Sequence, residues 1–176
     1  MTIFEKVCVV VMVLSCWAIG IFNVLSIDSI IKRHAAEDSK VVCTTLAQAL
    51  HNEEKRLEQY LHANGSRYSR EMAAACMLTS NPQLCGAMAL VESTANPYVA
   101  PGDSGKSKGA FQIQERYWKH FVGSIETDPF LQAEQWDAIM ALLLETRSLP
   151  GAISAYNGHG KGYVSKVWVH YRELLK

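Results

Sequence analysis

A single carboxylate at the end of an apolar run is the group in this sequence best placed for acid–base chemistry. Glu92 follows residues 85–91, a run of small and apolar side chains that is typical of the end of a buried helix. A carboxylate in that setting is partly desolvated, which disfavours its charged form and raises its pKa toward the range of a general acid. The alternative is a helix-end carboxylate with a structural partner. We expect Glu92 to be a proton donor.

Two polar motifs downstream carry side chains suited to holding a sugar. Gln112 lies in a Gly-Ala-Phe-Gln segment, and Tyr156 and Asn157 lie in an Ala-Tyr-Asn-Gly-His-Gly segment. Amide and hydroxyl groups are natural partners for sugar hydroxyl and acetamido groups. The alternatives are structural, since Tyr156 would also serve as a core aromatic residue and Gln112 as a helix cap.

The order Glu-Ser, then Gly-x-x-Gln, then Ala-Tyr-Asn-Gly-x-Gly resembles the catalytic domain of the soluble-type lytic transglycosylases (SLT domain), a lysozyme-like family that cleaves peptidoglycan. The resemblance covers roughly residues 66–176. It implies that Glu92 protonates the oxygen between N-acetylmuramic acid and N-acetylglucosamine, while the N-acetyl group of the substrate carries the developing charge. Glu92 then takes the proton of the muramic acid 6-hydroxyl, and a 1,6-anhydro ring closes without a second carboxylate.

The resemblance also implies roles for the other motif residues. Ser93 and Gln112 match residues that hydrogen-bond sugar and line the cleft. Tyr156 matches the tyrosine that positions the acid, and Asn157 matches its neighbouring support. The second motif departs from the commoner Gly-Leu-Met-Gln of the family, and we expect its Phe111 to be among the substrate-binding residues.

Two other functions remain open at this stage. Asp103, in the polar loop before the second motif, would make the protein an inverting muramidase of lysozyme type if it activated water on the far face of the sugar. A simple turn residue in Pro-Gly-Asp-Ser-Gly is the alternative for this position. From another class, a non-catalytic adaptor would use the lysozyme-like shape to grip glycan strands or partner proteins.

Length and charge bound the classes of protein. The 176 residues leave room for one ordinary domain and an appendage, and 17 basic residues balance 17 acidic ones. Because no basic excess exists to neutralise phosphates, we expect no nucleic-acid partner. The histidines form no pair at metal-ligand spacing. We therefore expect neither a metal nor an organic cofactor.

An apolar run over residues 7–25 predicts a transmembrane helix, since about 1.5 Å per residue gives roughly 28 Å. A cleaved signal peptide is the alternative, but no small-x-small cleavage site is evident. More basic residues follow the run than precede it, which by itself favours a cytoplasmic domain. Long domains translocate regardless of such charges. We therefore expect an inner-membrane anchor over residues 1–27, or one in a phage virion membrane, with the catalytic domain on the periplasmic, cell-wall side.

Residues 28–65 are expected to form a membrane-proximal helical stalk without an internal Gly or Pro. One face of it carries an apolar stripe at helical spacing. The stripe consists of Val42, Leu46, Leu50, Leu57 and Leu61. Asn64 and Gly65 then supply a helix stop and a domain boundary.

The remaining segment, residues 66–176, reads as short helices joined by Gly, Pro and Asn, without an alternating strand pattern, which predicts an all-α domain. Cys76 and Cys85 flank a turn-like link between two apolar helices. A disulfide there would staple a helix hairpin in an oxidising compartment, and two buried free thiols are the alternative. The small size favours local wall opening beside a secretion, conjugation or pilus apparatus, or in phage entry and lysis.

Overall fold

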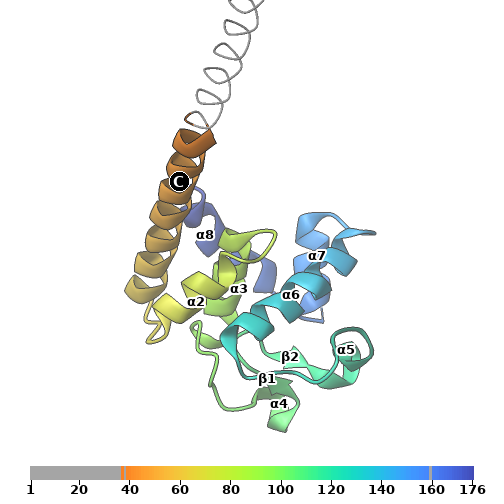
Figure 1. Ribbon diagram of the computed structural model, residues 1–176. Helices are drawn as coiled ribbons and strands as arrows, with labels where there is room; N and C mark the ends of the chain where they lie inside the picture. The colour runs from red at the N-terminus through yellow and green to blue at the C-terminus, as the bar shows by residue number, and fades with distance from the viewer. Residues whose placement is uncertain (1–36, 38, 159) are drawn as a thin grey trace, which may run out of the picture. The chain divides into compact units, whose positions relative to one another are not determined.

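A computed structural model of the protein describes residues 37, 39–158 and 160–176 (Figure 1). The predicted anchor over residues 1–27 and the start of the predicted stalk lie outside the described residues. Within the described part, no helix is both long and apolar enough to cross a membrane.

The described chain is mostly helical, which confirms the all-α class for this part of the protein. A first helix covers residues 39–63. The elements that follow are α2 (Ser69–Cys76), α3 (Pro82–Ser93), α4 (Gly102–Gly105), β1 (Ser107–Lys108), β2 (Ile113–Gln114), α5 (Glu115–Val122), α6 (Pro129–Leu144), α7 (Leu149–Tyr156) and α8 (Tyr163–Leu174). The two strands pair antiparallel, with Ser107 opposite Gln114 and Lys108 opposite Ile113. The sequence did not predict them, because two residues are too few to show a period of two.

The chain divides into two compact units, Met1–Leu50 and His51–Lys176. The two compact units divide after residue 50, whereas the sequence predicted a domain boundary at residue 65. Residues 51–63 belong to the second unit because Leu57 and Leu61 are buried there. Arg56 also donates a hydrogen bond to the carbonyl of Leu174. In the first unit, the N-terminal residues of the predicted stripe are exposed, namely Val42, Leu46 and Leu50.

Helix α3 packs against α2, α6 and α8 (Figure 1). It begins with Pro82 in its first turn, and the Asn81 side chain accepts a hydrogen bond from the Leu84 amide at 3.1 Å. All residues from Leu84 to Leu90 are buried. Gly86 permits the close approach of the first helix, since a Cβ atom there would lie 2.7 Å from Leu57 Cδ1.

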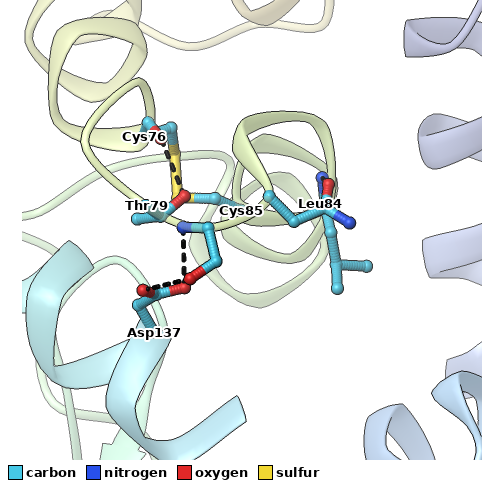
Figure 2. The surroundings of a disulfide bond; sticks show 7 residues. Cys76, Thr79, Leu84, Cys85 and Asp137 are labelled. Carbon is cyan, nitrogen blue, oxygen red and sulfur yellow. Dashed lines mark hydrogen bonds between the residues drawn. A yellow bond between two sulfur atoms is a disulfide. The ribbon is translucent and has the colours of Figure 1, made fainter. Parts of the chain in front are cut away.

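The predicted disulfide between Cys76 and Cys85 is present and joins the end of α2 to α3 (Figure 2). Within the bridged turn, Thr79 donates a hydrogen bond to the Cys76 carbonyl at 2.7 Å. The next residue, Ser80, donates from its amide and its hydroxyl to the carboxylate of Asp137 on α6, at 3.0 and 2.9 Å. The hairpin that carries α3 is thus held both covalently and by α6.

Candidate active site

A cleft of about 760 Å³ lies at the C-terminal end of α3 and joins all three sequence motifs. Glu92 reaches it from the last turn of α3, Gln112 from the turn before β2, and Tyr156 and Asn157 from the end of α7. These four residues were predicted as site residues. Glu92 and Tyr156 are 64 residues apart in the sequence. The packing of α6 against both α3 and α7 brings them together.

Glu92 owes its position to a sharp helix end. Thr94 and Ala95 both adopt left-handed backbone conformations, with φ of 58° and 52°. Their amides donate to the carbonyls of Leu90 and Ala89 at 3.0 and 2.8 Å, which satisfies carbonyl groups that the helix end leaves free. Glu92 is consequently held half-buried at the C-terminal end of the apolar helix α3.

Tyr156 is a hydrogen-bond donor that lies beside the Glu92 carboxylate. Its hydroxyl donates a hydrogen bond to the Phe111 carbonyl at 2.8 Å. Burial raises the pKa of Tyr156 well above its usual range, and the negative charge of Glu92 raises it further. The phenol therefore stays protonated at physiological pH and is unsuited to act as a base.

Tyr163, the first residue of α8, is a site residue that the sequence reasoning missed. Burial raises its pKa, with the charge of Glu92 as the second cause and a hydrogen-bonding interaction with that carboxyl as the third. Its buried hydroxyl makes no hydrogen bond of standard geometry with the described residues, but these effects place it close to Glu92. Glu92 thus faces two neutral phenols. The available signal was a tyrosine following the Gly-Lys-Gly turn directly after the third motif.

Gln112 lines the cleft, but its amide is engaged within its own loop. Its Oε1 accepts from the Gly102 amide at 3.1 Å, and its Nε2 donates to the Gly109 carbonyl at 3.0 Å. With φ of 47°, Gln112 closes the turn that brings the polar loop back onto the cleft. It does not cap a helix, because Gln114 holds the N-terminal position of α5.

The predicted substrate contacts of Ser93 and Phe111 are not supported. The Ser93 hydroxyl donates to the Ala110 carbonyl at 2.7 Å and accepts from the Asn96 amide at 3.0 Å, which ties α3 to the second motif. The Phe111 side chain is fully buried and stacks on Trp136 with 5.4 Å between ring centroids. Neither residue lines the cleft. Both instead support the segments that form its wall.

Gln132 on α6 is a second residue that the sequence reasoning missed, and it supports the same loop. It is fully buried. Its Oε1 accepts from the Ala110 amide at 2.6 Å, and its Nε2 donates to the Pro97 carbonyl at 3.2 Å. A Cβ atom at Gly109 would overlap this amide, so glycine is required there.

The remaining predictions concern Asp103 and metals. Asp103 lies in the short helix α4, and its side chain lies outside the described part of the structure. No group of three His, Cys, Asp or Glu side chains among the described residues is placed to hold a metal ion.

Comparisons with protein-family models, with curated proteins and with solved structures find no match for this chain. The resemblance to the lytic transglycosylases therefore rests on the three motifs and on the cleft in which they meet.

Proposed function

We propose that the protein is a lytic transglycosylase with a lysozyme-like catalytic domain that cleaves the β-1,4 bond between N-acetylmuramic acid and N-acetylglucosamine. The observation that supports it is the meeting of Glu92 with Tyr156, Gln112 and Asn157 in one cleft. Glu92 is the sole carboxylate among the described residues that line this cleft. A mechanism that needs one carboxylate fits that lining better than one that needs two.

In the proposed reaction, the Glu92 carboxylic acid gives its proton to the glycosidic oxygen as the bond from that oxygen to the muramic acid C1 breaks. The acetamido oxygen of the substrate stabilises the positive charge on C1. The Glu92 carboxylate then takes the proton of the 6-hydroxyl, whose oxygen bonds to C1. The neutral phenol of Tyr163 stabilises the carboxylate between the two steps. Tyr156, whose hydroxyl donates to the Phe111 carbonyl, holds the cleft wall beside it.

Digestion of purified peptidoglycan by the full chain tests this proposal. We expect products with 1,6-anhydromuramic ends and loss of at least a hundredfold in rate for Glu92→Gln, because general acid catalysis contributes about 10²–10⁴-fold. Glu134→Gln, an exposed carboxylate of α6, is the matched control and should remain active. Reducing ends in place of anhydro ends would show a muramidase. Binding to glycan strands without cleavage would show an adaptor.

The setting of the enzyme is part of the same proposal. The Cys76–Cys85 disulfide supports a domain that works in an oxidising compartment such as the periplasm. We infer an N-terminal membrane anchor with the domain on the cell-wall side, for local opening of peptidoglycan beside a secretion, conjugation or pilus apparatus or in a phage. A C-terminal reporter active only in the cytoplasm would contradict this orientation.

A further inference from the structure

Two arginines line the same cleft as Glu92 and come from separate elements. Arg116 lies in the first turn of α5, and Arg147 lies in the connection between α6 and α7. Both side chains are exposed. The Arg116 guanidinium lies 4.2 Å from the ring centroid of Tyr117, and Arg147 Nη1 donates to Thr146 Oγ1 at 3.0 Å. Neither arginine forms a salt bridge with a described residue.

The nearest acidic neighbour of Arg116 along the chain is already neutralised. Glu115 pairs with Lys108 at 3.0 Å and with Lys119 at 3.7 Å. The hydrogen bond and the charge of Lys108 lower the pKa of Glu115, so this carboxylate stays ionised and paired. Among the described lining residues, two positive guanidinium groups thus stand against the single carboxylate of Glu92. The wall formed by α5 and the α6–α7 connection is electropositive.

An anionic group in the substrate would complement this electropositive wall. The sugar rings of a chain of N-acetylglucosamine and N-acetylmuramic acid carry only hydroxyl, ether and acetamido groups, which are neutral. Negative charge lies on the lactyl arm of the muramic acid, either as the lactyl carboxylate itself or as carboxylates of a peptide attached to it. A guanidinium group binds a carboxylate through two parallel hydrogen bonds, which makes arginine the residue suited to this recognition.

We propose that Arg116 and Arg147 form a carboxylate-binding subsite for the lactyl arm of muramic acid or the peptide that extends from it. This inference rests on the proposed function and narrows its substrate to glycan strands that carry carboxylates. The subsite orients the muramic acid on the correct side of Glu92, so that an uncharged polymer of N-acetylglucosamine is excluded from productive binding.

The test compares kcat/KM of the full chain and of the double variant Arg116→Gln, Arg147→Gln on four substrates. The substrates are peptide-bearing peptidoglycan, the same material with its carboxylates amidated, glycan strands stripped of peptide that retain the lactyl carboxylate, and an N-acetylglucosamine oligomer. We expect amidation and the double substitution each to lower kcat/KM about tenfold or more, and their combination to add nothing further. Arg67→Gln, Arg70→Gln removes two exposed charges away from the cleft and is the matched control.

The pattern across substrates identifies the carboxylate. A loss confined to stripped strands assigns the free lactyl carboxylate, and a loss confined to peptide-bearing material assigns the peptide carboxylates. A loss on both materials shows that the subsite accepts either carboxylate. Arg116→Lys, Arg147→Lys keeps the charge without the guanidinium geometry and should recover part of the loss. If the double glutamine variant and the wild type respond equally to amidation, the subsite does not exist.

Failure of the two proposals is distinguishable. A wild-type protein that cleaves none of the four substrates contradicts the proposed function. A wild-type protein that cleaves peptidoglycan through Glu92, while the arginine variants cleave all substrates at the wild-type rate, contradicts the carboxylate subsite alone.

Discussion

Chemistry at the residue scale centres on one carboxylate between two phenols. Tyr156 is tied to the Phe111 carbonyl, whereas Tyr163 interacts with Glu92 itself. A neutral phenol next to a carboxylate stabilises the charged form, which is the counterpart of the raised pKa of the phenol. The two tyrosines therefore have different tasks, with Tyr156 holding the cleft wall and Tyr163 adjusting the acid.

Substitution of Tyr163 by Phe should shift the pH profile of the proposed peptidoglycan cleavage. Without the phenol, the Glu92 carboxylate is less stable, so its pKa rises and the acid form persists to higher pH. We expect the alkaline limb of kcat/KM to move to higher pH. The profile of peptidoglycan cleavage between pH 4 and 9 measures this.

Tyr98→Phe, an exposed tyrosine outside the cleft, controls for the change of side chain and should leave the limb unmoved. A Tyr163→Phe enzyme with lower activity but an unmoved limb would show that Tyr163 supports the fold and does not adjust Glu92.

The sequence predicted which motifs meet but not which way each side chain points. Glu92, Tyr156 and Asn157 line the cleft because a helix end and a tight turn leave little choice of direction. Ser93 and Phe111 sit beside them in the same motifs and point elsewhere, since adjacent positions lie on different faces of the backbone. The position of Tyr163 depends on the rotation of α8, and its local signal is limited to the Gly-Lys-Gly turn that precedes it.

At the scale of elements, the hairpin of α2 and α3 sets the position of the helix end that carries Glu92. The turn, the Asn81 cap and the cysteine pair were all predictable, because each is a local signal of side chain and spacing. The buried face of α6 is harder to predict from the sequence. Phe130 and Leu144 are 43% and 42% exposed, and the buried amide of Gln132 occupies the core side instead. Long-range hydrogen bonds of that kind leave no trace in a hydrophobic pattern.

Removal of the disulfide should lower stability without changing the chemistry. A bridge with a sequence separation of 9 restricts a short loop of the unfolded chain. Its loss through Cys76→Ala, Cys85→Ala should cost about 2–3 kcal/mol of unfolding free energy. Urea unfolding followed by tryptophan fluorescence gives the value.

Cys43→Ala is the matched control, because Cys43 is an exposed free cysteine outside the second unit, and its stability should equal that of the wild type. An equal midpoint for the double variant would mean that Asp137 and Ser80 hold the hairpin without help.

At the scale of the whole molecule, the second unit includes residues 51–63 of the first helix, which the sequence predicts to be part of a stalk. One apolar stripe continues from Val42 to Leu61, so nothing local marks residue 50 as the boundary. The distinction comes from partners far along the chain. Tyr60 and His170 are hydrogen-bonded at 3.0 Å and join residues 51–63 to α8. Partners 110 residues apart are invisible to a periodicity argument.

The burial of His170 limits the stability of the second unit at acid pH. Burial lowers the pKa of His170 from its ordinary value of 6.5, so the folded protein binds this proton less readily than the unfolded chain does. The stabilisation is complete above pH 6.5 and is lost as the pH falls through the lowered pKa of the folded state. Urea midpoints between pH 7.5 and 5 should fall for the wild type and fall less for His170→Phe. His62→Phe, an exposed histidine, should retain the wild-type slope.

At alkaline pH the buried phenols limit the stability of the second unit, which falls as the pH rises. Burial raises the pKa values of Tyr156, Tyr163 and Tyr60 above their ordinary value of 10.0, so the folded state holds their protons more tightly than the unfolded chain. Their stabilisation is complete below pH 10 and declines as the pH rises beyond it. Because Glu92 contributes to two of these shifts, Glu92→Gln should weaken the decline in urea midpoint above pH 10 while it abolishes cleavage. An unchanged alkaline decline in Glu92→Gln would place the carboxylate away from both phenols and would remove the arrangement on which the proposed chemistry depends.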